Sequence, residues 1–190
     1  MTALDLGPAT RATATLVAGV RDDQLGERTP CPAYTVADLL DHVGGLSVAF
    51  TAAAHKDLTP HAPSADGARL EPGFRDRIGA ALSELAEAWR TPGAFDGMTQ
   101  AGPVELPADV AALVALNEVV VHGWDLARAT GQPYEPDPAS VEACLGFARS
   151  FEVPDETDEG PFGPPVDVPA DAPALDLLAG ATGRRPDWAT

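Results

Sequence analysis

The stretch NEVVVHGWDLARATG, residues 117–131, is as apolar as a protein core, yet it contains Glu118, His122 and Asp125. At about 100° per residue on a helix, these three side chains fall in one narrow sector, while valines, leucines and a tryptophan spread over most of the remaining circle. A helix that is apolar on nearly all sides is a buried one. The stretch therefore predicts a core helix with a thin polar edge.

Helix-start and helix-end signals surround this stretch and recur elsewhere in the chain. Pro107 suits the first turn of the helix, and Gly131 suits its end. Thr35 is a good N-cap, and Asp38 completes a capping pattern three residues later. Similar signals and apolar spacing predict the other helices: 8–22, 35–55, 72–90, 138–151 and a short one at 174–179.

The segments between these helices have no convincing strand pattern. Residues 56–71 and 91–106 are predicted to be irregular connections, and the acidic run 152–160 a solvated loop without the spacing of a calcium-binding loop. Long amphipathic helices joined by loops form helical bundles. We therefore expect an all-α fold in one domain, 1–190, with a proline-rich C-terminal extension at 154–190.

The composition is strongly acidic, with a formal net charge of −17 and a single lysine, Lys56. A nucleic-acid surface needs clustered basic residues, so no nucleic-acid partner is expected. Charged residues, Gly or Pro interrupt the apolar stretches before about 18 residues, so no membrane span is expected. The first twenty residues do not look like a secretory signal, and two cysteines are too few for a disulfide framework. We expect a cytoplasmic protein.

Glu118 and His122 lie one helical turn apart and point the same way. Two interpretations are open from this helix alone. The polar sector is either the exposed edge of a buried helix, with an ordinary i,i+4 contact, or half of a divalent-metal site. Glutamate and histidine at helical spacing build metal sites in other helical bundles.

A metal site needs a third ligand, and three other histidines are candidates. His61 falls in a proline-rich loop and His55 at a helix end, where surface histidines are common. His42 instead lies in mid-helix among apolar residues, where a lone histidine is more often a satisfied core residue. Gly44 and Gly45 follow it, and such glycines disfavour a helix. They indicate either close helix packing or space for a ligand.

The two cysteines and the tryptophan near the polar sector have simpler interpretations. Cys31 lies shortly before a helix N-cap, whose dipole would lower the pKa of a thiol facing it. The alternative, which we favour, is a small buried residue between two prolines. Cys144 is expected in the core, and Trp124 points away from the polar sector into the bundle.

Three segments resemble one protein family: TPCPAYTVADLLDHVGG (29–45), NEVVVHGWDLARATG (117–131) and FGPPVDVPADAPALDLLAGATGRRPDW (162–188). They are similar to the metal-binding proteins related to mycothiol-dependent maleylpyruvate isomerase, within the DinB/YfiT-like superfamily. The resemblance covers almost the whole chain. It implies a DinB-like four-helix bundle with up-down-down-up topology and an extra C-terminal helix and tail.

The resemblance also implies one divalent metal, most often Zn²⁺, held by His42, Glu118 and His122. Ni²⁺, Fe²⁺ or copper would suit the same ligands. Asp125 is not a usual ligand of the family, and we expect it to orient a ligand imidazole or to pair with Arg128.

Two departures from the family pattern bear on activity. The full isomerases carry a further C-terminal domain, for which this chain has no room, and Tyr34 stands where a Trp is common. Both leave metal binding intact.

Three functional hypotheses follow. The first is a metal-dependent thiol transferase or isomerase that activates mycothiol for attack on an electrophile. The second is a non-catalytic metal- or ligand-binding module, and the third a structural bundle without metal. The sequence does not identify the substrate or the metal, and it does not decide between a monomer and a homodimer.

Overall fold

The computed structural model describes residues 4–57, 65–151 and 162–189. Its α-helices and β-strands are α1 (Gly7–Gly19), α2 (Val36–Ala54), α3 (Phe74–Trp89), β1 (Met98–Ala101), β2 (Val104–Pro107), α4 (Ala108–Thr130), α5 (Pro138–Ser150) and α6 (Ala174–Ala181). Every helix expected from the sequence is present, with ends that agree to within about three residues. His61 and the acidic run 152–160 lie outside the described residues.

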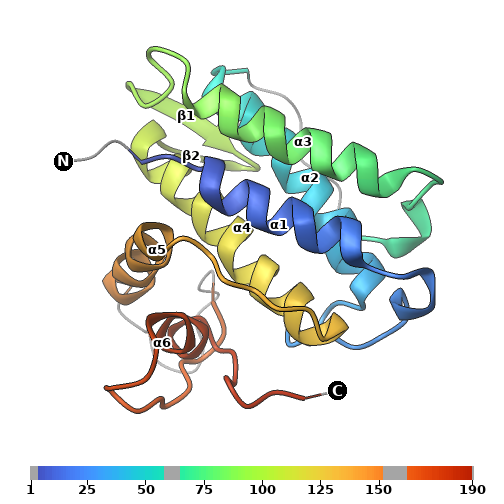
Figure 1. Ribbon diagram of the computed structural model, residues 1–190. Helices are drawn as coiled ribbons and strands as arrows, with labels where there is room; N and C mark the ends of the chain where they lie inside the picture. Colours follow the sequence, from blue (N-terminus) through green and yellow to red (C-terminus); the bar gives the residue numbers. More distant parts are fainter. Residues whose placement is uncertain (1–3, 58–64, 152–161, 190) are drawn as a thin grey trace.

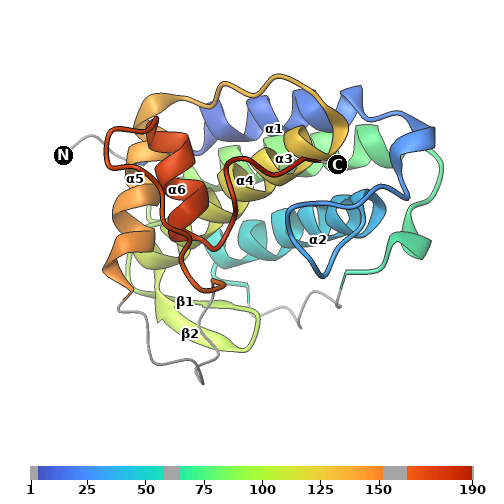
Figure 2. The ribbon, with the colours of Figure 1, turned by 90° about the horizontal axis from the view of Figure 1, so that it is seen from below.

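The first four helices form a bundle with up-down-down-up topology. Figure 1 shows α1 and α4 running in one direction and α2 and α3 in the other. Helix α1 packs on α3 and α4, and α2 packs on the same two helices. The expected all-α fold is confirmed. Helices α5 and α6 pack on each other and on α4, outside the four-helix bundle, as Figure 2 shows.

The start and the packing of α2 follow from its sequence. The Thr35 side chain accepts a hydrogen bond from the Asp38 backbone N–H, and the Asp38 carboxylate accepts one from the Thr35 N–H. This is the capping box that the sequence predicted. A Cβ at Gly44 would lie 3.2 Å from the Ile78 side chain of α3. Close packing of α2 on α3 therefore explains this glycine.

Helix α4 is the core helix that its composition predicted. Most of its residues are buried, among them Trp124. It is long and apolar enough to cross a membrane by length and composition, but 78% of its apolar window is buried in the fold. The core helix of a globular protein meets the same criterion, so this property is weak support for a membrane span. Cys144 of α5 is also fully buried, as expected.

One prediction from the sequence was wrong: part of the segment 91–106 is a β-hairpin. Strands β1 and β2 pair antiparallel, and Met98 lies opposite Pro107. The two-residue connection begins at Gly102, whose φ of 57° is in the left-handed region that favours glycine. The buried Thr99 side chain donates to the Ala53 carbonyl, 2.6 Å away, and so fastens the hairpin to the end of α2.

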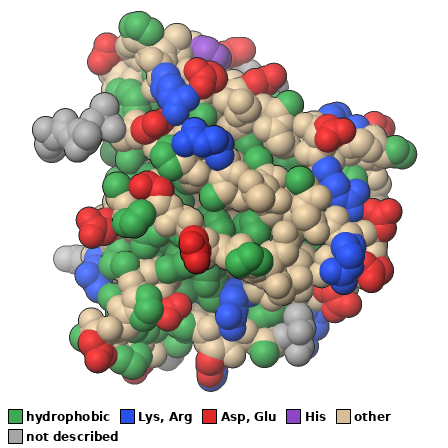
Figure 3. Space-filling model, in the orientation of Figure 1, with side chains coloured by type: hydrophobic (Ala, Val, Ile, Leu, Met, Phe, Trp, Pro, Cys, Tyr) green, Lys and Arg blue, Asp and Glu red, His purple; other side chains and the backbone are tan. Residues whose placement is uncertain are grey.

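The surface carries both charge signs. On the face shown in Figure 3, basic side chains lie beside acidic ones near the edges, and apolar side chains are visible between α5 and the four-helix bundle.

Candidate metal centre

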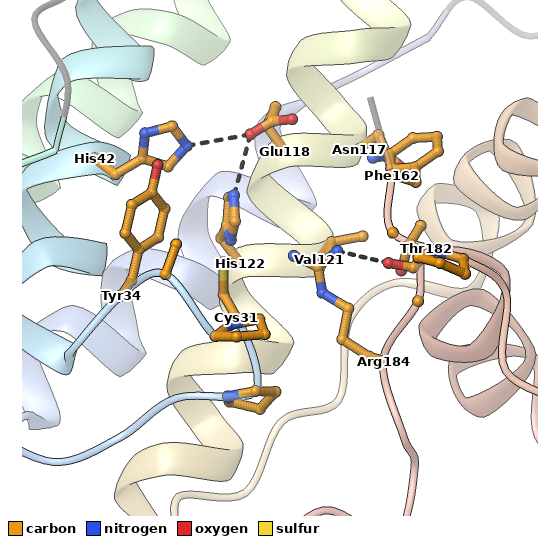
Figure 4. A pocket seen from close by; sticks show the side chains of 16 residues that line it. Cys31, Tyr34, His42, Asn117, Glu118, Val121, His122, Phe162, Thr182 and Arg184 are labelled. Carbon is orange, nitrogen blue, oxygen red and sulfur yellow. Dashed lines mark hydrogen bonds and ion pairs between the residues drawn. The ribbon is translucent and has the colours of Figure 1, made fainter. Parts of the chain in front are cut away.

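The structure brings His42, Glu118 and His122 together, although His42 comes from α2 and the other two from α4. The Nε2 atoms of His42 and His122 lie 3.4 Å and 3.2 Å from Glu118 Oε2. One ligand atom from each of the three residues lies within 4.8 Å of the others. Figure 4 shows both imidazoles turned toward this carboxylate, that of His42 from α2 and that of His122 from α4 itself. The distances suit three donors facing one small cation.

Asp125 holds the ring of His122 in place. His122 Nδ1 lies 3.0 Å from Asp125 Oδ2, and this carboxylate is completely buried. A carboxylate only accepts hydrogen bonds, so the contact places a proton on Nδ1 and directs Nε2 toward Glu118. Ligand histidines of metal sites are commonly held in this way through their second nitrogen.

The arginine that pairs with Asp125 is Arg184 and not Arg128. The Arg184 guanidinium contacts both carboxylate oxygens, with Nη2 3.0 Å from Oδ2 and Nε 3.3 Å from Oδ1. Arg128 instead donates to the Trp188 carbonyl and stacks near the Trp124 ring. The proposed ligand on α4 is thus linked through Asp125 to the C-terminal segment that follows α6.

The charges of the cluster stabilise one another. Burial raises the pKa of Glu118, but hydrogen bonds from His122 and His42 outweigh it and hold the pKa below its ordinary value. Burial lowers the pKa of His122, and the hydrogen bonds to Asp125 and Glu118 reverse this and raise it to about 9. Without a metal, His122 is therefore a cation at neutral pH between two carboxylates.

The three residues open into a cavity of about 450 Å³. Loop 30–34 forms one wall, and the centroid of its Tyr34 ring lies 5.2 Å from that of the His42 ring. Figure 4 shows the two rings side by side. The C-terminal segment forms the opposite wall with Phe162, Pro164 and Arg184. A ligand bound at the three side chains would therefore contact residues from both ends of the chain.

Cys31 lies in this wall and is only partly buried. The favoured interpretation as a simple buried residue was therefore wrong. The alternative of a lowered pKa is not supported either, because burial and the Asp125 charge raise the pKa of the thiol, and Arg184 only partly offsets them. His55 is exposed at the end of α2, in agreement with its interpretation as a surface residue.

The sequence did not identify two residues that line the cavity, Asn117 and Arg184. Asn117 directly precedes Glu118 on the helix but falls about 100° away from it, outside the sector of Glu118, His122 and Asp125. Arg184 lies 59 residues beyond Asp125, and no local pattern links the two.

A sequence model of the mycothiol maleylpyruvate isomerase N-terminal domain matches residues 6–127, more than half of the chain. The chain belongs to this family. The matched range includes His42, Glu118 and His122 on α2 and α4 and ends before α5. The resemblance inferred from the three sequence segments is thereby confirmed.

Two further proteins are similar to the chain over most of its length. Two proteins of Mycobacterium tuberculosis, from strains CDC 1551 / Oshkosh and ATCC 25618 / H37Rv and both described as uncharacterized, are 34% identical to the chain. Each alignment covers 91% of this chain and 92% of the relative.

Solved structures of the mycothiol-dependent maleylpyruvate isomerase share the fold. The crystal structures of this isomerase and of its histidine-to-alanine mutant each superpose with a TM-score of 0.59, at 17% and 15% identity. The superposition covers 75% of this chain and 66% of the isomerase chain. The chain thus spans slightly less than two thirds of that enzyme.

Proposed function

We propose that the protein is a metal-dependent thiol transferase or isomerase. In this proposal His42, Glu118 and His122 bind one divalent ion, with Zn²⁺ as the first candidate and Ni²⁺ or Fe²⁺ as alternatives that suit the same donors. The thiol, proposed to be mycothiol, adds its thiolate sulfur to one carbon of a conjugated carbon–carbon double bond, whose π electrons move into the adjoining carbonyl group. A transferase stops here, once the adduct takes up a proton. An isomerase lets the former double bond, now a single carbon–carbon bond, rotate, and then expels the thiolate as the double bond re-forms.

One observation carries the proposal: the three donors converge at the edge of a cavity that is large enough for a small molecule. Two imidazole nitrogens and one carboxylate oxygen form a donor set typical of catalytic zinc, in which a further position stays open to a ligand. The family membership and the name of the structurally similar isomerase support the choice of mycothiol as the thiol.

The chain's own residues have distinct tasks in this proposal. A bound divalent ion would favour the deprotonated form of a thiol at neutral pH. Asp125 keeps His122 Nε2 directed at the metal site, and Glu118 supplies the negative charge of the three donors. Tyr34 and Phe162 line the two walls of the cavity and would shield a ligand from water.

The proposal is tested by turnover with the zinc-loaded protein. Mycothiol is mixed with maleylpyruvate, or with bromobimane-type electrophiles, and product is followed by chromatography. We expect turnover by the natural sequence and none above background for His42→Ala. Equal rates for the two proteins would refute the enzymatic proposal. Stoichiometric metal with no turnover and no thiol binding would favour a non-catalytic metal-binding module.

Metal binding is expected to release about one proton at pH 7 from His122. The pKa of this histidine is raised to about 9 in the metal-free protein, so its Nε2 carries a proton that a metal must displace. Affinity should therefore rise about tenfold per pH unit up to about pH 9 and level off above it. Calorimetry in buffers of different ionisation enthalpy measures the proton count. No proton release at pH 7 would contradict the expectation.

A further inference from the structure

Tyr34 places a hydroxyl group beside the proposed metal ligands. The centroid of its ring lies 5.2 Å from that of His42 and 6.4 Å from that of His122, and the residue lines the same cavity. Figure 4 shows the Tyr34 hydroxyl next to the His42 ring. This end of Tyr34 therefore borders the space that a ligand of the metal would occupy.

The Tyr34 hydroxyl is free to bind a ligand. It has no hydrogen-bond partner among residues 4–57, 65–151 and 162–189, and although the residue is half-buried, its oxygen atom remains accessible. A phenol in water titrates at about pH 10, and partial burial raises the pKa of Tyr34 further. The group therefore keeps its proton at neutral pH and can donate a hydrogen bond to an oxygen atom in the cavity.

The loop that carries Tyr34 is held by hydrogen bonds of its backbone. The Tyr34 N–H donates to the Cys31 carbonyl at 3.0 Å, and the Tyr34 carbonyl accepts from the Thr29 hydroxyl at 2.8 Å. The next residue, Thr35, is the N-cap of α2, the helix that carries His42. A donor that is fixed in advance needs no reorganisation when charge develops beside it. Tyr34 meets this condition.

Two other donors of the cavity wall already have partners in the fold. Arg184 binds the Asp125 carboxylate and the Thr182 carbonyl, and the Thr182 hydroxyl donates to the backbone of α6. The Glu118 carboxylate can only accept hydrogen bonds, and it faces the two imidazoles. Tyr34 differs from these residues because its donor is left for a substrate.

We propose that the Tyr34 hydroxyl donates a hydrogen bond to the carbonyl oxygen of the electrophile. As the sulfur electron pair forms the carbon–sulfur bond, the π pair of the carbon–carbon double bond moves toward the carbonyl carbon, and the carbonyl π pair moves onto the oxygen. Negative charge grows on this oxygen, so the hydrogen bond strengthens in the transition state. Tyr34 keeps its proton throughout, and expulsion of the thiolate reverses the same electron movements.

The inference rests on the proposed function. It adds a catalytic residue to that function, and it requires a substrate whose carbonyl group is conjugated with the double bond that the sulfur attacks.

Binding of two thiols tests the contact without turnover. 4-Mercaptobutan-2-one has the spacing of sulfur and carbonyl found in an adduct, and 1-butanethiol lacks the carbonyl oxygen. Calorimetry with the zinc-loaded protein should show that Tyr34→Phe weakens binding of the ketone roughly two- to tenfold and leaves that of 1-butanethiol unchanged. Tyr134→Phe is the matched control, because the Tyr134 hydroxyl donates to the Val120 carbonyl and does not line the cavity. It should change neither affinity.

Kinetics with two electrophiles test the catalytic role. Addition of a thiolate to maleylpyruvate develops charge on a carbonyl oxygen, whereas benzyl bromide expels bromide with the bonding electron pair and has no carbonyl group. With mycothiol as the thiol, Tyr34→Phe should lower kcat for maleylpyruvate about 100-fold with little change in KM. The rate with benzyl bromide should stay unchanged.

Three results would overturn the role of Tyr34. Weaker binding of both thiols to Tyr34→Phe would place the hydroxyl against the sulfur or make it a support for His42, and unchanged binding of both would remove the contact altogether. An equal loss of kcat with both electrophiles would show that the hydroxyl does not act on the carbonyl oxygen.

Failure of the proposed function gives a different pattern. If the natural sequence turns over neither electrophile but Tyr34→Phe weakens only the ketone, the protein is not the proposed enzyme, and the hydrogen bond to the carbonyl stands. If neither thiol binds to the natural sequence, the thiol chemistry is wrong and the role of Tyr34 in it is refuted as well.

Discussion

Replacing Glu118 with glutamine is expected to abolish stoichiometric metal binding. Its carboxylate oxygen faces the Nε2 atoms of both His42 and His122, so it is the central donor of the cluster. Glutamine keeps the size of the side chain but removes the only negative charge among the three donors. Loss of a supporting group around a metal commonly lowers the metal affinity 10–100-fold, and loss of a direct ligand should lower it by more than about 100-fold.

Mass-spectrometric metal analysis after dialysis measures this effect. We expect about one ion per chain for the natural sequence and almost none for Glu118→Gln. His55→Ala is the control, because His55 is an exposed histidine at the C-terminal end of α2 and lies outside the cluster. Full metal content in Glu118→Gln, with an intact fold by circular dichroism, would show that these residues are not the metal site.

Replacing Asp125 with alanine is expected to cause a large loss of stability. Asp125 is fully buried and pairs with Arg184, whose side chain is only 12% exposed. Without the carboxylate, Arg184 remains buried without its counter-charge and His122 loses the acceptor at Nδ1. Breaking a buried ion pair from one side commonly costs about 3–5 kcal/mol in the free energy of unfolding.

Urea unfolding of the metal-free protein measures the loss. The double variant Asp125→Ala/Arg184→Met should recover part of it, since the unpaired guanidinium is then absent. Arg185→Met removes one partner of the exposed pair with Asp187 and should leave the unfolding midpoint unchanged. A loss below about 1 kcal/mol for Asp125→Ala would show that the pair contributes little.

The bundle could be predicted from the sequence because its helices carry local signals. Thr35 with Asp38 marks a helix start, and Gly131 a helix end, through hydrogen bonds that span only a few residues, whereas Pro107 marks the start of α4 through its fixed backbone angle. The hairpin could not be predicted in this way. Its strands are four residues long, too short for an alternating pattern, and Thr99 holds them through a contact with Ala53 on another element.

In the candidate site, too, contacts within one helix could be predicted from the sequence, and contacts between distant elements could not. Glu118 and His122 could be paired from their spacing on one helix. His42 could be named as a candidate from its mid-helix position, but only the family resemblance favoured it as a ligand over a buried core residue, because its place beside Glu118 depends on how α2 packs against α4. The pairing of Asp125 with Arg184 and the place of the Tyr34 ring beside the two imidazoles are properties of the three-dimensional arrangement. No single-helix pattern contains either of them.

The contact between Asp125 and Arg184 has a consequence for the order of events during synthesis. The arginine follows the aspartate by 59 residues. At about 5–20 residues per second, a ribosome adds it roughly 3–12 s after the aspartate. All four bundle helices, with the three proposed ligands, have been synthesised before Arg184 is added, whereas Asp125 lacks its counter-ion until then. The cavity can therefore take its final form only after Arg184 has been added and has reached Asp125.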